Sequence, residues 1–111
     1  MTLHRFRDLA DVDAALAAAD FLVFKHSNRC PVSAAAFEEY EAFVAAHPTA
    51  PTAWIDVIAE RPWSQHVAAA TGVTHESPQA LLVRGGRVVW HASHDAITRD
   101  SLASAVALAQ R

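Results

Sequence analysis

The sequence contains only one cysteine, Cys30, among its 111 residues. A single cysteine excludes a framework of disulfides within the chain, so the fold does not depend on an oxidising compartment. The sequence also lacks any apolar run near the roughly 20 residues that a helix needs to cross a bilayer, and it has no charged start followed by a long apolar stretch. We therefore expect a cytoplasmic protein without a membrane partner.

A large net charge of either sign is absent as well. The formal net charge is −3, and the basic residues are scattered, which argues against a nucleic-acid partner. Trp54, Trp63 and Trp90 do not interleave with a basic patch, so they are most simply core or rim aromatics. Seven histidines are present, but only His91 and His94 are close in sequence, whereas zinc sites need clustered ligands. We expect no bound metal and no bound cofactor.

What the sequence does have is apolar residues, which make up 52% of it. That share is enough for a core of its own, and the length is ordinary for one domain. No linker, repeat or low-complexity tract divides the chain. We therefore expect a single domain over residues 1–111.

Hydrophobic periodicity predicts alternating helices and strands, punctuated by Gly72 as a helix stop and by Gly85 and Gly86 as a tight hairpin. Residues 21–25 form a short continuous apolar run, which is typical of a central strand covered on both faces. Residues 4–7 are a poor candidate for an additional first strand. The expected elements are a helix capped by Asp8 that extends to Ala19, a strand at 21–25, a helix at 31–47, a strand at 54–58, a helix at 62–71, strands at 80–83 and 88–90, and a final helix capped by Thr98.

Cys30 follows the apolar run and precedes a helix, with Pro31 at a first-turn position where its missing N–H costs nothing. The first turn of a helix has unpaired N–H groups and the positive end of the helix dipole, and both favour thiolate over thiol. The cations Lys25 and Arg29 are near in sequence and act in the same direction. Lone cysteines are otherwise usually small buried hydrophobes. We interpret Cys30 as a reactive nucleophile.

Ser33 stands where the second cysteine of a Cys-x-x-Cys pair would be, so Cys30 has no local partner with which to close a disulfide. The Ser33 hydroxyl has two readings: it bonds backbone in the first turn, or it donates to the thiolate one turn back. His26 either orients the loop before Cys30 or is a packed residue at the strand end. Asp56 is expected to face an open side or to cap a neighbouring group rather than to act as a base.

Three motifs carry a resemblance to a known family. Phe24-Lys25-His26-Ser27, then Cys30-Pro31-Val32-Ser33 and later His75-Glu76-Ser77-Pro78-Gln79 resemble the monothiol bacilliredoxins of the YtxJ type, a thioredoxin-fold family tied to the small thiol bacillithiol. The resemblance covers nearly the whole chain. It implies an α/β, thioredoxin-like fold with a central mixed sheet of four strands, or five if residues 4–7 join it, flanked by helices on both faces.

The resemblance also implies roles around Pro78. In thioredoxin-like proteins the proline before the hairpin is cis and faces the nucleophile, and the backbone of the preceding residue pairs with the substrate like an added strand. Ser77 is then the backbone clamp and Pro78 the cis residue, although an isolated X-Pro bond is usually trans. Thioredoxins carry an acid six residues before the nucleophile, and Phe24 occupies that place here, so a buried base of that kind is not expected.

The resulting hypothesis is a monothiol thiol–disulfide oxidoreductase that removes bacillithiol from client proteins through Cys30, with bacillithiol as co-substrate and bacillithiolated proteins as partners. Arg29 is the first candidate to hold the carboxylates of the small thiol, with Lys25 and Arg61 in reserve. The alternative is a non-catalytic binding module or redox sensor whose Cys30 is capped by a small thiol. A third hypothesis, reduction of an oxidised species such as arsenate, usually requires a resolving thiol, which the sequence lacks.

Overall fold

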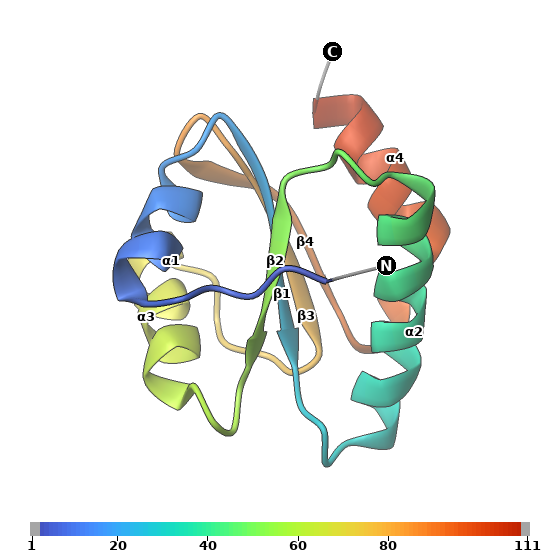
Figure 1. Ribbon diagram of the computed structural model, residues 1–111, viewed down its shortest axis with the longest axis horizontal. Coiled ribbons are helices and arrows are strands. Elements are labelled where there is room, and N and C mark those ends of the chain that lie inside the picture. The colour runs from blue at the N-terminus through green and yellow to red at the C-terminus, as the bar shows by residue number, and fades with distance from the viewer. Residues whose placement is uncertain (1–2, 110–111) are drawn as a thin grey trace.

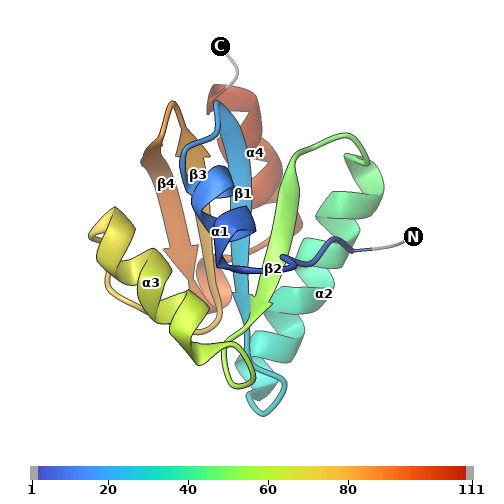
Figure 2. The same ribbon diagram turned by 60° about the vertical axis from the view of Figure 1, so that its left-hand side comes forward.

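The computed structural model describes residues 3–109, which form one mixed β-sheet with helices on both faces (Figures 1 and 2). The sheet order is β2-β1-β3-β4, and β1 pairs with β2 in parallel and with β3 antiparallel. The predicted α/β architecture is confirmed. The elements are α1 (Leu9–Leu16), β1 (Asp20–His26), α2 (Pro31–Ala46), β2 (Thr52–Asp56), α3 (Arg61–Thr71), β3 (Gln79–Arg84), β4 (Arg87–Ser93), a 3₁₀ turn (His94–Ala96) and α4 (Arg99–Ala109).

The first residues of the described chain add no fifth strand to this sheet. They cross β2 at a single bridge between Arg5 and Trp54, where the Trp54 N–H donates to the His4 carbonyl at 3.2 Å. The Arg5 guanidinium lies 4.0 Å from the centre of the Trp54 ring, so the crossing is held by a cation–π contact as well. Of the two strand numbers expected, the structure has four.

Side-chain alternation along the central strand β1 divides the core into two layers. Leu22 and Phe24 pack into the layer beneath α2 and α4, whereas Val23 packs into the layer beneath α1 and α3. All three are essentially inaccessible to solvent. The uninterrupted apolar run of this strand is thus explained by burial on both faces.

The predicted boundaries of β2 are wrong at both ends. The strand begins at Thr52, whose hydroxyl donates to the Leu22 carbonyl at 2.7 Å and contacts the Tyr40 hydroxyl at 2.7 Å. It ends at Asp56 because that carboxylate accepts the N–H groups of Ile58 and Ala59, both at 3.0 Å, and so closes a turn. Asp56 therefore caps a turn, as one of its two readings expected.

Neighbouring residues predict the caps of the first and last helices, but they do not predict where the first helix ends. Asp8 caps α1 as predicted, because its carboxylate accepts the Asp11 N–H at 2.9 Å, but the helix ends at Leu16 and does not reach Ala19. At the last helix, Thr98 accepts the Ser101 N–H at 3.0 Å and its own N–H donates to the Ser101 hydroxyl at 2.9 Å. Capping is thus confirmed at both helices.

The sheet topology gathers three loops at one end of the molecule, the lower end in Figure 1. The parallel strands β1 and β2 both end there, and the antiparallel strand β3 begins there. Residues 27–30, 57–60 and 72–78 form these loops. Across residues 3–109, no helix has the length and apolar character needed to span a membrane.

Candidate active site

Cys30 is the N-cap residue of α2, at the junction of strand and helix that the sequence indicated. Its backbone is extended, with φ −116° and ψ 121°, and Pro31 opens the helix. Its carbonyl accepts the Ala34 N–H at 3.0 Å. Pro31 has no N–H, and the first-turn N–H groups of Val32 and Ser33 have no partner within a helix of this geometry. The partly buried thiol therefore occupies the position where a serine or aspartate would cap these donors.

The hydroxyl of Ser33 is bonded to the loop that leads to the thiol. Ser33 is fully buried, and its Oγ accepts the Ser27 N–H at 2.8 Å and lies 3.0 Å from His26 Nδ1. Within residues 3–109 no hydrogen bond joins Ser33 Oγ to the sulfur of Cys30. The contacts thus match the backbone-bonding reading of Ser33, and they fix the chain direction between His26 and Cys30.

His26 is a packed strand-end residue that also orients this loop through Ser33. Its ring stacks on Phe37 with centroids 4.2 Å apart and meets the edge of Trp54 at 5.5 Å. Burial lowers the pKa of His26, although Asp56 and the bond to Ser33 oppose that shift. A neutral imidazole protonated at Nε2 accepts the Ser33 hydroxyl proton. Ser27 N–H, Ser33 hydroxyl and His26 Nδ1 then form one chain of hydrogen bonds.

Lys25 lies on the opposite face of the sheet from His26. It is the only lysine in the sequence, and it is completely buried. Its Nζ lies 3.1 Å from His75 Nδ1, and burial lowers its pKa from 10.5 to about 8. Lysine is almost never fully buried without a charged partner. The ammonium group is covered by the imidazole, so Lys25 is not a surface cation beside the thiol.

The peptide bond between Ser77 and Pro78 is cis, as the resemblance implied. Pro78 is buried, and its carbonyl accepts the His94 N–H at 3.1 Å. On either side of it, the Ser77 hydroxyl and Gln79 Oε1 are buried without a hydrogen-bond partner. Buried polar groups are normally hydrogen-bonded. The segment around Pro78 is therefore unusual, because it leaves two such groups unpaired at the end of the sheet that carries Cys30.

Arg29 is exposed on the loop directly before the thiol. Its N–H donates to the Ser27 hydroxyl at 3.4 Å, and within residues 3–109 its guanidinium forms no ion pair. Pro31 is exposed as well. The structure therefore brings Cys30, Arg29, Pro31 and the buried Ser33 together at the start of α2, whereas Lys25 lies behind His75. In the same range, no three side chains of the metal-ligating types gather.

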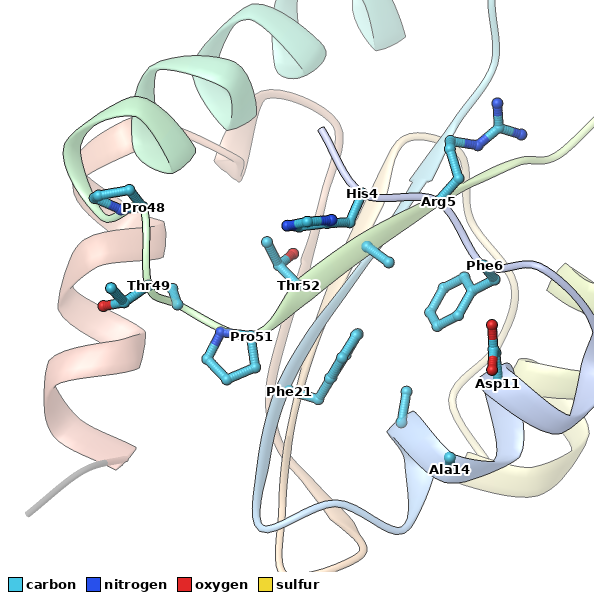
Figure 3. A pocket seen from close by; sticks show the side chains of 13 residues that line it. His4, Arg5, Phe6, Asp11, Ala14, Phe21, Pro48, Thr49, Pro51 and Thr52 are labelled. Carbon is cyan, nitrogen blue, oxygen red and sulfur yellow. The ribbon is translucent and has the colours of Figure 1, made fainter. Parts of the chain in front are cut away.

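One sizeable cavity lies away from the thiol. It has a volume of about 550 Å³ and is lined by Phe6 and Phe21, by the segment 48–53 and by part of α1 (Figure 3). These residues include the beginnings of β1 and β2, whereas Cys30 follows the end of β1. Size alone therefore does not mark the candidate active site.

In the sequence, His75 stands out only as part of a motif and has no predicted role of its own. In the structure it is the one hydrogen-bond partner of the Lys25 ammonium group among the described residues. The two residues are separated by 50 positions, so spacing gave no signal. The signal that could have paired them is their presence in two motifs of the same resemblance.

Comparisons with known proteins find a matching family model and solved structures of the same fold. The family model described as monothiol bacilliredoxin BrxC matches residues 1–102. A solved structure of a candidate oxidoreductase with a thioredoxin fold has 29% identity and a TM-score of 0.84, covering 98% of this chain and 94% of that one. The fold alone is shared with Trxlp from Edwardsiella tarda, at 17% identity and a TM-score of 0.71 with coverage of 95% and 98%. The same holds for the oxidised thioredoxin of Plasmodium falciparum, at 11% and 0.72 with coverage of 96% and 97%.

Proposed function

Because this chain belongs to the monothiol bacilliredoxin family, we propose that it releases bacillithiol from mixed disulfides on client proteins by disulfide exchange at Cys30. Family and fold together support a thiol oxidoreductase. The observation that carries the finer proposal is the place of the sole cysteine at the N-cap of α2. We place the reaction in the cytoplasm, where small thiols keep cysteines reduced.

The exchange needs no oxidant or reductant besides the two thiols. The Cys30 thiolate attacks the bacillithiol sulfur of the mixed disulfide, one S–S bond forms as another breaks, and the client leaves as a thiolate that takes a proton from water. A second bacillithiol thiolate then attacks the sulfur of the adduct on Cys30. Bacillithiol disulfide departs and Cys30 is restored. Every step conserves the number of S–S bonds.

The surrounding groups have separate tasks in this proposal. The first-turn N–H groups of α2 stabilise the Cys30 thiolate before attack and after release. The backbone of Ser77, beside the cis bond to Pro78, pairs with the extended client segment. Arg29 is exposed next to the thiol, and its forked donors suit a carboxylate of the small thiol. No bound cofactor is required.

The test is turnover of a bacillithiolated client by the Cys30→Ser protein. We expect release of bacillithiol to stop with this variant, while the wild type completes many cycles when free bacillithiol is supplied. The intact mass of wild-type protein after one cycle without free bacillithiol should show one adduct on Cys30. Release at the wild-type rate by Cys30→Ser would assign the nucleophile elsewhere.

A redox sensor whose Cys30 is capped by the small thiol remains the second candidate. It is favoured by one observation: the chain has no second cysteine to resolve the adduct, so the cap persists until another molecule removes it. Turnover separates the two functions. A sensor accepts one equivalent of the small thiol and then stops, even when free bacillithiol is abundant.

A further inference from the structure

A second recess lies near the start of α3, at the same end of the sheet as Cys30. Its volume is about 410 Å³, within the range of small-ligand sites. Val57 and Ile58 form an apolar wall, and Arg61 and His75 supply the charged and aromatic groups, together with Ser64 and Gln65. Val57 is joined to the end of β1, because its N–H donates to the His26 carbonyl at 2.9 Å. The recess thus adjoins the strand that leads to the thiol.

The polar groups of this recess are mainly donors. The guanidinium of Arg61 has five N–H groups and accepts nothing. At neutral pH the buried ammonium of Lys25 donates to His75 Nδ1, which leaves the proton of the neutral imidazole on Nε2. The Ser64 hydroxyl is already used, since it donates to the Arg61 carbonyl at 3.0 Å. His75 is exposed, so its Nε2–H is available to a bound acceptor.

Carboxylates close to the recess in sequence are engaged elsewhere. Glu60 pairs with Arg5 at 2.7 Å and its Oε1 also accepts the Asp56 N–H at 2.9 Å. Glu76 lies 3.6 Å from His94. No ion pair within residues 3–109 involves Arg61 or Lys25. Partial burial of the imidazole is the largest cause that lowers the pKa of His75. The charges of Lys25 and Arg61 lower it further, and Glu76 opposes them. The positive charge of Lys25 and Arg61 is thus partly offset by Glu76, but neither cation is paired with a carboxylate within residues 3–109.

We propose that Arg61 and His75, with Lys25 holding the imidazole, form a carboxylate-binding subsite for the disulfide substrate. This inference rests on the proposed function and extends it to substrate recognition. The carboxylate belongs either to the small thiol or to an acidic side chain of the client next to its cysteine. Lys25 does not touch the carboxylate and acts as a positioning residue through His75.

The experiment uses four peptide mixed disulfides and the full-length protein. The peptide carries Glu or Gln beside its cysteine, and the small thiol is mercaptosuccinate or the neutral 2-mercaptoethanol. Arg61→Gln should raise KM about tenfold for the substrates that carry the recognised carboxylate and leave the fully neutral one unchanged. Arg84→Gln, which makes the same change of charge at an exposed position at the end of β3, is the matched control.

The pattern across the four substrates identifies the source. An increase in KM that follows mercaptosuccinate assigns the subsite to the small thiol, and one that follows Glu assigns it to the client. An equal change on all four substrates, or no change on any, would overturn the subsite.

A second measurement is independent of turnover. Added succinate should shift the NMR signals of the His75 imidazole in the wild type and in Arg84→Gln, but not in Arg61→Gln. If the wild type fails to turn over any mixed disulfide, the proposed function fails, whereas the succinate titration still decides the subsite. A His75 signal that does not respond to succinate in the wild type would contradict the inference directly.

Discussion

Lys25 and His26 are neighbours at the end of β1, yet they serve opposite faces of the sheet and two different loops. His26 belongs to the α2 face and is tied through Ser33 to the loop that carries Cys30. Lys25 belongs to the α3 face and is tied through His75 to the loop that carries the cis proline. Because Lys25 and His26 are adjacent, the loop that carries Cys30 and the loop that carries Pro78 are both tied to the end of β1.

The two faces differ in how well their polar groups are satisfied. On the His26 face the groups are neutral, and Ser27 N–H, Ser33 hydroxyl and His26 Nδ1 bond one another among stacked aromatic rings. On the Lys25 face the groups carry net positive charge and donors outnumber acceptors. A closed network stabilises a single loop geometry, whereas an open one is suited to an incoming anion. In the proposed function, the His26 face, called the closed face below, positions the nucleophile Cys30, and the Lys25 face, called the open face, recognises the substrate.

The largest expected effect comes from breaking the closed face. Ser33→Ala leaves the Ser27 N–H and the His26 ring without a partner in a buried place, which should cost about 3 kcal/mol of unfolding free energy. Chemical denaturation measures it. Ser104→Ala, at an exposed serine of α4, is the matched control and should change stability by less than about 0.5 kcal/mol.

The same variant separates the two readings of Ser33. If its hydroxyl served chiefly the thiolate, Ser33→Ala would leave stability near the wild-type value and slow only the exchange reaction. We expect the reverse weighting, because both observed bonds of Ser33 Oγ are to groups of the loop and the strand. A small loss of stability together with a large loss of rate would contradict this account of the closed face.

Breaking the open face should make the protein more stable. Lys25→Met removes a buried ammonium whose pKa falls from 10.5 to about 8 on folding, a shift that corresponds to about 3 kcal/mol. After the lost hydrogen bond to His75 is subtracted, we expect a gain of about 2 kcal/mol at pH 7. At the same time the preference for carboxylate-bearing substrates should weaken. A variant that gains stability and loses selectivity is the signature of a functional residue.

The pH dependence gives this prediction its sign. The folded protein binds the Lys25 proton less tightly than the unfolded chain does, so the cost is fully present below pH 8 and is relieved as pH rises from about 8 to 10.5. The stability difference between Lys25→Met and the wild type should therefore shrink over that range. Since Lys25 is the only lysine, labelled lysine gives one side-chain NMR signal, whose titration midpoint should lie near pH 8. A midpoint near 10.5 would remove the basis of the prediction.

The sequence predicts the closed face more completely than the open one. The junction at Cys30 and the caps at Asp8 and Thr98 depend on neighbours in sequence, so local signals were sufficient. The cis bond before Pro78 came from the resemblance, because base rates for an isolated proline favour trans. These features share one property: each is determined within a few residues or by a recurring motif.

The open face depends on contacts that are distant in sequence. Lys25 was expected to be a cation near the thiol because the two residues are close in sequence, and no pattern linked it to His75. The difference between the predicted and the observed bounds of β2 has a similar origin. Its start is fixed by bonds from Thr52 to Leu22 and Tyr40, which come from other elements, and its end is fixed by the turn at Asp56. Tertiary contacts override periodicity at these positions.

The smallest expected effect tests whether recognition extends beyond the open face to the thiol loop. Arg29 is exposed and adjoins Cys30, so Arg29→Ala should leave stability within about 0.5 kcal/mol of the wild type. If its guanidinium binds a carboxylate of the small thiol, KM for the bacillithiolated substrate should rise about tenfold, which corresponds to about 1.4 kcal/mol. The 2-mercaptoethanol disulfide of the same client should be almost unaffected. Arg29→Lys should recover only part of the loss, because lysine cannot form the forked contact. Equal losses on the charged and the neutral substrate would mean that Arg29 acts on the Cys30 thiolate itself. Substrate recognition would then not extend from the open face to the loop that carries the thiol.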